Sequence, residues 1–275
     1  MPELPEVETT ILGLRPHVLQ QTIVAMTIRQ HRLRWSIPTD TPEKVCGHII
    51  HSITRRGKYI LMATQGGTML IHLGMSGRLR VLPQASAPGK HDHIDLHLEQ
   101  HILRYTDPRR FGAWIWIQNQ PVLQHPLLIK LGVEPFDPQF DGHYLWQMAR
   151  NKAVSIKTFI MDQHVVVGVG NIYATEALFT CKLHPSTPAK QVSLEKMTQL
   201  AQAIRTILNY AIQAGGSSLK DFLQTDGKPG YFTLQLQIYN RAGLPCPQCA
   251  TLLEKLTIGQ RTSTFCPQCQ VYPSS

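Results

Sequence analysis

The stretch CPQCATLLEKLTIGQRTSTFCPQC, residues 246–269, decides how the last part of the chain folds. It holds two CPQC knuckles, Cys246 with Cys249 and Cys266 with Cys269, separated by sixteen residues. Each knuckle lets two thiolates reach one tetrahedral Zn²⁺, and the spacer is long enough for a hairpin that returns the second knuckle to the first. Four cysteines close the coordination shell of the ion. We therefore expect one structural Zn²⁺ per chain and no catalytic metal.

Chance spacing and a ribbon closed by two disulfides are the alternatives to a zinc site. The beginning of the chain, MPELPEVE, is acidic and has no apolar signal core, which favours metal over disulfides. No apolar run approaches the roughly 20 residues that span a bilayer. We expect a cytoplasmic protein without a membrane partner, associated with the nucleoid if its source is bacterial. Cys46 and Cys181 are solitary, and each is expected to be a small buried apolar residue.

The charge of the chain points to a polyanionic partner. There are 27 Lys and Arg against 18 Asp and Glu, which gives a net charge of +9 and a pI of about 9.4. Nucleic acid is the first candidate for such a partner, ahead of an anionic membrane surface. Arg261 lies inside the predicted hairpin, where a guanidinium suits a phosphate. The plain alternative is a finger that only stabilises the fold.

The basic residues are spread over several short clusters. Between Arg29 and Arg110 there are 13 Lys and Arg against 6 Asp and Glu. A disordered basic tail would concentrate them in one block, whereas short clusters on several strands suit a groove that follows a phosphate backbone. The clusters are Arg29/Arg32/Arg34, Arg55/Arg56/Lys58, Arg78/Arg80 and Arg109/Arg110.

Hydrophobic periodicity predicts a helix followed by a β domain. Apolar residues recur at steps of three and four over residues 3–19, which places them on one helical face. From about residue 22 to 118 the segments become short and rich in β-branched and aromatic residues, with glycine and proline between them. Such a region predicts an antiparallel sandwich or small barrel. The clearest strands are Thr68–Leu73, His93–Leu98 and Phe111–Ile117.

The second half of the chain has a helical pattern. The Pro-, Gly- and Asp-bearing stretch within residues 119–142 predicts a connection between domains. Helices are expected over residues 143–162, 171–181 and 193–214, and then a loop over Ser217–Phe232 and a strand over residues 233–239. The overall class is therefore α+β.

The N-terminus offers a candidate nucleophile. Loss of the initiator methionine would leave Pro2 with a free secondary amine, and an α-amino group with a pKa of roughly 8 is partly unprotonated near neutral pH. Such an amine can attack an aldehyde-like carbon and form an iminium ion. Glu3 and Glu6 would lie beside it, and one of them could act as the acid–base catalyst. Acids in a first helical turn more often serve only the helix dipole.

Seven motifs in one order resemble the bacterial formamidopyrimidine-DNA glycosylase family, also called 8-oxoguanine DNA glycosylase. The resemblance covers nearly the whole chain. It implies an N-terminal β-sandwich headed by a helix (1–130), a helix–two-turn–helix DNA-binding domain (131–240) and a four-cysteine zinc finger (241–275). The motifs are the N-terminal MPELPEVE, HLGMSG (72–77), KHDH (90–93), RYTDPRRFGAW (104–114), VVGVGNIYATEALF (166–179), TDGKPGYF (225–232) and the finger.

The resemblance implies four catalytic residues. Pro2 matches the nucleophile that attacks C1′ of the damaged nucleotide, and Glu3 matches the acid–base residue that helps to open the sugar. Lys58, in RRGKY, matches the lysine of base release and β-elimination. Arg261, in GQRTSTF, matches the finger arginine that grips phosphates and assists δ-elimination.

It also implies a set of DNA contacts. A nucleotide swung out of the stack leaves a gap that something must fill. Met75 and Phe111 match the apolar fillers, and Arg109 matches the residue that reads the orphaned cytosine. Each of the three could instead be an ordinary core or turn residue. Asn171 matches a phosphate contact, and Asn151, with Arg150 as the alternative, matches a second one. Lys157 and His91 match further DNA-contact positions, and the 217–232 segment matches the base-recognition loop.

The activity implied is a bifunctional DNA glycosylase and AP lyase that removes oxidised purines opposite cytosine in duplex DNA and then nicks the strand. We expect it to act as a monomer and without a redox cofactor. Three alternatives stay open: the sister endonuclease VIII family, which prefers oxidised pyrimidines; a damage-binding protein without chemistry; and a zinc-ribbon transcription factor. Leu4 and the Arg109/Phe111 pair favour the purine enzyme. Pro2, Glu3 and Lys58 together argue against the non-catalytic alternatives.

Overall fold

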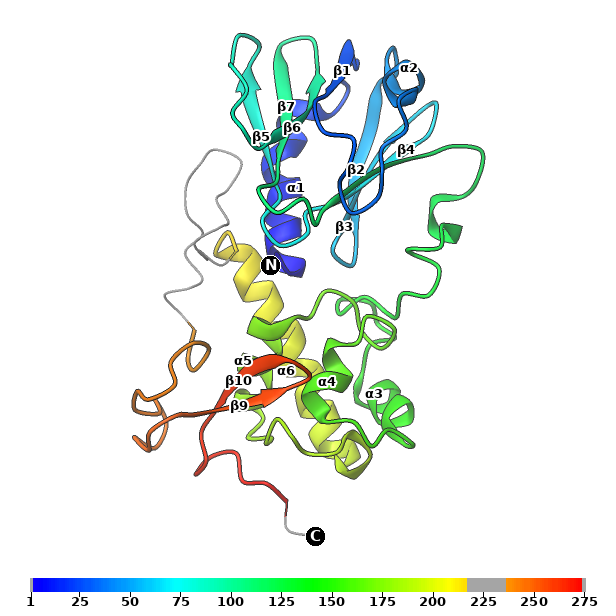
Figure 1. Cartoon of the computed structure of the whole chain (residues 1–275). Helices are drawn as coiled ribbons and strands as arrows, with labels where there is room; N and C mark the ends of the chain where they lie inside the picture. Colours follow the sequence, from blue (N-terminus) through cyan, green and yellow to red (C-terminus); the bar gives the residue numbers. More distant parts are fainter. Residues whose placement is uncertain (1, 217–235, 274–275) are drawn as a thin grey trace. The chain divides into compact units, whose positions relative to one another are not determined.

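The computed structural model describes residues 2–216 and 236–273, which form two compact units (Figure 1). Of the described residues, the N-terminal unit contains 2–129 and 214–216, and the C-terminal unit contains 130–213 and 236–273. None of the helices described in these ranges could cross a membrane. In chain order the elements are α1 (Leu4–Val18), β1 (Ala25–Ile28), α2 (Thr41–Val45), β2 (Ile50–Arg56), β3 (Tyr59–Thr64), β4 (Thr68–His72), β5 (Arg78–Pro83), β6 (Asp92–His97), β7 (His101–Thr106), β8 (Ala113–Ile117), η1 (Val122–Gln124), α3 (Gly142–Ala149), α4 (Ile156–Met161), α5 (Asn171–Thr180), η2 (Ala189–Gln191), α6 (Leu194–Gln213), β9 (Glu254–Ile258) and β10 (Arg261–Phe265).

Helix α1 confirms the predicted stripe. Its apolar residues at steps of three and four are all buried, and four of them, Val7, Ile11, Leu14 and Val18, belong to the core of the N-terminal unit. Pro5 stands in the first turn, where its missing N–H costs nothing. The buried stripe consists of Leu4, Val7, Ile11, Leu14 and Val18.

Two four-stranded antiparallel sheets complete the N-terminal unit, in the orders β1-β6-β7-β5 and β2-β3-β4-β8. Alternating side chains from both sheets meet α1 in one core, so the predicted sandwich is confirmed. Ile94 and Leu103 enter it from the first sheet, and Met62, Ile71 and Trp114 from the second. Three connections along the chain pass from one sheet to the other: β1–β2, which contains α2, and the β4–β5 and β7–β8 loops.

The prediction of one helix over residues 143–162 is wrong, because two helices occupy this range. Helix α3 ends at Ala149 and α4 begins at Ile156. The hydroxyl of Ser155 accepts the backbone N–H of Thr158 at 3.1 Å and so caps a new helix. Residues 171–181 and 193–214 are helical as predicted, within a residue at each end.

Within the C-terminal unit, a buried carboxylate on α5 binds the backbone of residues 237–239. Glu176 accepts the backbone N–H groups of Gln237, Ile238 and Tyr239 at 2.7–3.0 Å. Burial raises the pKa of Glu176, and these three bonds act in the opposite direction. The strand predicted over residues 233–239 is wrong for 236–239, which form no strand. Residues 233–235 and the predicted 217–232 loop lie outside the described residues.

Candidate functional site

The residues before α1 place a proline next to two buried acids. Pro2 is buried, and Glu3, at 3% exposure, is the N-cap of the helix. The backbone N–H of Glu3 donates to Oε2 of Glu6 at 2.8 Å, and Glu6 is 1% exposed. The two acids form a reciprocal capping box. Carboxyl groups held in this way beside Pro2 can exchange protons with a group bound there.

Lys58 lies in the tight turn between β2 and β3 and is 7% exposed. Gly57, which precedes Lys58 in this turn, has a φ of 57°, a backbone conformation that favours glycine. Arg55 on β2 donates through Nη1 to the carbonyl of Gly57 at 3.1 Å and through Nε to Glu8 of α1 at 2.8 Å. This ion pair ties the helix that follows Pro2 to the hairpin that carries Lys58.

His72, at the end of β4, was not singled out by the sequence analysis, although it begins the HLGMSG motif. Burial, and then the positive charges of Lys58 and Arg34, lower the pKa of His72 to about 4, while Asp107 raises it in part. The backbone N–H of Gly74 donates to Nδ1 of His72 at 3.0 Å. The imidazole is therefore neutral at pH 7 with its proton on Nε2, where it can donate a hydrogen bond beside two cations.

Met75, Arg109 and Phe111 are brought together by two adjacent loops. Met75 lies on the β4–β5 loop and the other two on the β7–β8 loop. The Arg109 guanidinium carbon is 4.7 Å from the centre of the Phe111 ring. Phe111 is 47% exposed and Met75 half-buried, and both line a cavity of about 310 Å³ together with Arg34, His72 and Gly74.

The two loops touch through their backbones at a pair of glycines. A Cβ at Gly74, where φ is 64°, would lie 2.5 Å from the backbone nitrogen of Gly112. A Cβ at Gly112 would overlap the Tyr105 hydroxyl. No other residue fits at either position without moving the loops. Met75, Phe111 and Arg109 thus lie at the surface on two loops whose backbones are closely packed.

Some of the arginines between Arg29 and Arg110 pair with internal acids. This reduces the number of cations that are available to the predicted phosphate groove. Arg29 pairs with Asp95, and Arg80 pairs with Asp92 at 3.1 Å. Arg104 is 2% exposed and pairs with both acids, and these contacts help to hold the pKa of Asp92 and of Asp95 low. These side chains stabilise the first sheet from within. Arg104 is therefore not accessible to phosphate, and Arg29 and Arg80 are already paired with internal acids.

The remaining predicted contacts of the N-terminal unit and of α3 are on the surface. His91 is half-buried before β6, and its carbonyl accepts the N–H of Asp107 at 3.0 Å. Arg109 is exposed. In the C-terminal unit, Asn151 and Arg150 are exposed in the turn after α3, where Arg150 stacks over Trp146.

Lys157 and Asn171 meet under the finger hairpin. Lys157 is 1% exposed, and its ammonium donates to the hydroxyls of Ser263 at 2.7 Å and Thr175 at 3.1 Å. The Asn171 amide donates to the carbonyl of Thr262 at 3.1 Å, and Lys157 reaches the same carbonyl at 3.4 Å. Both predicted DNA contacts therefore hold β10 directly beside Arg261. As direct DNA contacts they remain predictions.

Arg261 itself is exposed at the start of β10, and no carboxylate pairs with it in the described ranges. It lines a cavity of about 410 Å³ in the C-terminal unit with Lys152, Lys157 and the apolar side chains of α4. An unpaired guanidinium over an apolar wall is open to an anionic ligand.

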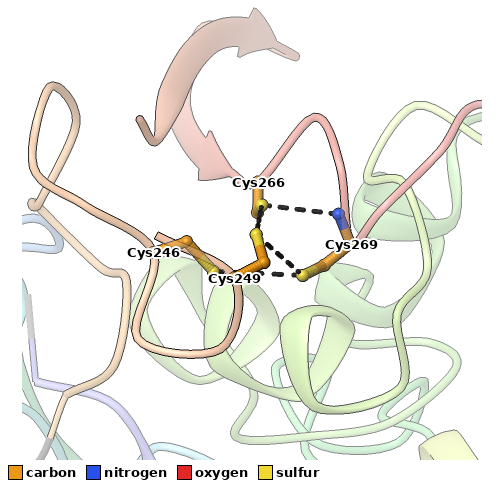
Figure 2. Close-up of side chains that lie close together, drawn as sticks. All are labelled: Cys246, Cys249, Cys266 and Cys269. Carbon is orange, nitrogen blue, oxygen red and sulfur yellow. Dashed lines mark hydrogen bonds between the residues drawn. The ribbon is translucent and has the colours of Figure 1, made fainter. Parts of the chain in front are cut away.

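Figure 2 shows the sulfur atoms of Cys246, Cys249, Cys266 and Cys269 converging. All four lie within 4.8 Å of one another, and three pairs are 3.5, 3.5 and 3.9 Å apart. Thiolates at 2.3 Å from a tetrahedral ion are about 3.8 Å apart. The set fits one Zn²⁺, which would need all four in the thiolate form. Hydrogen bonds from Thr251 lower the pKa of the exposed Cys249 to about 6.

The finger is packed onto the helical part of its unit. Gln270 accepts the N–H of Cys266 at 2.9 Å and donates to the carbonyl of Leu183 at 2.8 Å. Phe179 of α5 shares a buried cluster with Cys246, Leu253 and Cys266. The metal site therefore orients the hairpin on which Arg261 stands.

Comparisons with known proteins agree along the whole chain. Three family models match in order: the formamidopyrimidine-DNA glycosylase N-terminal domain over residues 1–114, the H2TH domain of the same enzyme over 131–223, and a zinc finger found in FPG and IleRS over 243–271. The formamidopyrimidine-DNA glycosylase of Photobacterium damsela subsp. piscicida is 53% identical over 98% of this chain and 100% of its own.

Solved structures give the same match. A Lactococcus lactis FPG mutant in complex with a Fapy-dG containing DNA superposes with a TM-score of 0.93 at 32% identity, covering 98% of this chain and 100% of that one. The MutM (FPG) protein from Thermus thermophilus does so with a TM-score of 0.87 at 37% identity, covering 99% and 100%. The predicted fold class, with its C-terminal zinc finger, is confirmed.

Proposed function

Since the chain belongs to the formamidopyrimidine-DNA glycosylase family, and is a DNA glycosylase of DNA repair, we propose that it excises oxidised purines opposite cytosine and then cuts the strand. The observation that carries this proposal is the position of Pro2, next to the buried pair Glu3 and Glu6. A secondary amine at that place requires removal of Met1. The substrates are 8-oxoguanine and formamidopyrimidines in duplex DNA, and the protein acts as a monomer in the cytoplasm.

The first chemical step joins enzyme and sugar. The lone pair of the Pro2 nitrogen forms a bond to C1′ while the glycosidic bond breaks, and the base leaves with the proton that the Pro2 nitrogen gives up. Glu3 protonates the ring oxygen as the C1′–O4′ bond breaks, which leaves an iminium ion. Lys58, 7% exposed in its turn, helps to release the base.

The iminium then acts as an electron sink for strand cleavage. It acidifies the C2′ proton, and loss of that proton expels the 3′ phosphate by β-elimination; a second elimination expels the 5′ phosphate. Lys58 assists the first elimination and Arg261 the second. The products are a gap flanked by phosphates and, after water hydrolyses the imine, the sugar remnant as an unsaturated aldehyde and free enzyme. No oxidant or reductant is consumed.

Recognition is divided among the remaining residues. Met75 and Phe111 fill the gap left by the extruded nucleotide, and Arg109 reads the orphaned cytosine. Their adjacency in one cluster supports this proposal. Asn171 and Asn151 contact phosphates, Lys157 and His91 belong to the DNA-binding surfaces of their units, and the four-cysteine site binds structural Zn²⁺.

Borohydride trapping on a duplex with one 8-oxoguanine opposite cytosine tests the proposal. Borohydride reduces an enzyme–DNA imine to a stable adduct, which peptide mapping assigns to a residue. We expect an adduct at Pro2. An adduct that forms only on a thymine glycol duplex would move the protein to oxidised pyrimidines. Binding of both duplexes without an adduct on either would indicate a damage-binding protein.

A further inference from the structure

The side chain of Asp107 is fully buried, and it lies between the two loops of the N-terminal unit that carry Met75, Arg109 and Phe111. Its Oδ1 accepts the hydroxyl of Ser76 at 2.7 Å, and Ser76 directly follows Met75. Its Oδ2 accepts the backbone N–H of Gly112 at 2.9 Å, and Gly112 directly follows Phe111. One carboxylate thus bonds the β4–β5 loop and the β7–β8 loop at the same time.

The same residue shapes the turn that presents Arg109. The carbonyl of Asp107 accepts the N–H of Arg110 at 3.2 Å, with Pro108 at the next position, where a turn favours proline. The N–H of Arg109 is shared between Oδ1 of Asp107 at 3.3 Å and the Ser76 hydroxyl at 3.2 Å. Arg110 has a φ of 57°, which turns the chain between Arg109 and Phe111.

A fourth donor completes the shell of the carboxylate. The Tyr105 hydroxyl donates to Oδ2 at 3.0 Å, and burial together with Asp107 raises the pKa of Tyr105, so it stays protonated as a donor. A buried carboxylate with four donors, two on each oxygen, holds their geometry tightly, because a donor whose oxygen is replaced loses its acceptor in a buried place. An amide in its place offers only one acceptor oxygen.

We propose that Asp107 is a positioning residue for DNA with an extruded base, which holds Met75, Arg109 and Phe111 in the arrangement that fills the gap. This inference rests on the proposed function, because it assumes that these three residues enter the duplex. In this role Asp107 acts only through its neighbours and touches no reacting atom. Its loss should therefore weaken the steps that need a filled gap and the reading of the opposite base. It should leave the chemistry at Pro2 intact.

The test compares two substrates of the Asp107→Asn variant. One is the 8-oxoguanine:cytosine duplex, and the other is a single-stranded oligonucleotide with one abasic site, which has no stack to fill and no opposite base. We expect single-turnover excision from the duplex to fall about 100-fold, the order of loss that a misplacement of 1 Å causes. Cleavage of the single strand should be unchanged. The preference for cytosine over adenine opposite the lesion should fall toward one.

Two further variants separate positioning from simple destabilisation. Asp95→Asn removes an equally buried carboxylate, 1% exposed and bonded to Arg29 and Arg104 in the same unit. It should lower the Tm but keep the ratio of duplex to single-strand activity. Ser76→Ala should reproduce a weaker form of the Asp107→Asn ratio, and Ser76→Thr should restore it, because threonine keeps the hydroxyl.

The outcomes are distinct. An equal loss on both substrates in Asp107→Asn, an unchanged duplex rate, or the same change of ratio in Asp95→Asn would each overturn the positioning role. If Asp107→Asn does not fold, as judged by circular dichroism, the Ser76 pair decides in its place. If the wild-type protein cleaves neither substrate, the proposed function itself fails and the inference falls with it.

Discussion

The ammonium of Lys157 on α4 donates a hydrogen bond of 2.7 Å to the hydroxyl of Ser263 on β10, 106 positions later in the chain. Both residues are buried, at 1% and 0% exposure. Ser263 lies two residues after Arg261, the residue proposed to bind phosphate. This bond therefore fixes the finger hairpin to the helical part of its unit close to Arg261.

Replacing Lys157 by methionine should lower the free energy of unfolding by about 1–3 kcal/mol, because the hydroxyls of Thr175 and Ser263 lose a charged partner in a buried place. Urea denaturation of the two proteins measures this difference. The matched control is Lys152→Met on the surface nearby, which should stay within about 0.5 kcal/mol of wild type. Equal effects of the two substitutions would mean that the buried bonds add no stability.

Arg261→Gln should weaken DNA binding without unfolding the finger. If Arg261 neutralises one phosphate, the slope of log K against log salt concentration should become shallower by about one. Titrating a fluorescent duplex at several salt concentrations gives the slope. Lys255→Gln, exposed on β9, is the control for loss of one charge from the same hairpin. A slope equal to that of wild type would remove Arg261 from the phosphate contacts.

The Cys249→Ser variant should lose zinc. Wild-type protein should contain one zinc ion per chain by atomic absorption, and Cys46→Ser should retain it, because Cys46 lies outside the cluster. Chelation of the metal should also abolish duplex binding, since the four ligands hold the hairpin that carries Arg261. The assignment would be contradicted if Cys249→Ser kept its full zinc content and released zinc to a chelator as wild type does.

His72 should make the fold sensitive to acid between about pH 6.5 and 4. Its pKa is lowered from 6.5 to about 4 in the folded chain. Between these values the unfolded chain binds the proton more readily, so the free energy of unfolding falls as the pH decreases through this window. In His72→Asn, whose amide oxygen can still accept the Gly74 N–H, this part of the pH dependence should disappear. Urea denaturation at a series of pH values measures it, and identical profiles would contradict the shift.

Glu3→Gln should separate base excision from strand cleavage. Glutamine can still cap α1 but cannot deliver a proton, so single-turnover excision of 8-oxoguanine should fall roughly 10²- to 10⁴-fold. Cleavage at a preformed abasic site, where the base is already gone and the sugar opens by itself, should fall less. Glu43→Gln, an exposed acid in the first turn of α2, controls for loss of one charge. Full excision activity in Glu3→Gln would overturn its acid–base role.

Features that depend on local spacing could be predicted from the sequence. The stripe from Leu4 to Val18 follows the helical period, and the two knuckles place four thiolates at one point whatever the rest of the chain does. The break between α3 and α4 is local too, since Ser155 is a recognisable cap. The apolar period continues through this cap, and it therefore predicts one helix where there are two.

Features that depend on distant contacts could not be predicted. The pKa of His72 reflects charges at Arg34 and Lys58, which only the second sheet and its neighbouring segments bring close. Asp107 meets Ser76, 31 residues earlier, because two loops between sheets pack together. Arginines look alike in a sequence whether they face solvent or, like Arg104, pair with an internal acid. Lys157 likewise reads as a surface cation until the hairpin covers it.

The packing of Phe179 against the knuckle cysteines bears on how such a finger can spread by recombination. A gene segment that encodes only residues 243–271 would carry the metal ligands into a new host, but not the aromatic side chain or the Leu183 carbonyl on which the knuckles rest. The transplanted hairpin would bind its ion and leave an apolar underside bare. A host protein that retains the finger must therefore have, or acquire, a helix with an aromatic residue that packs against this apolar side.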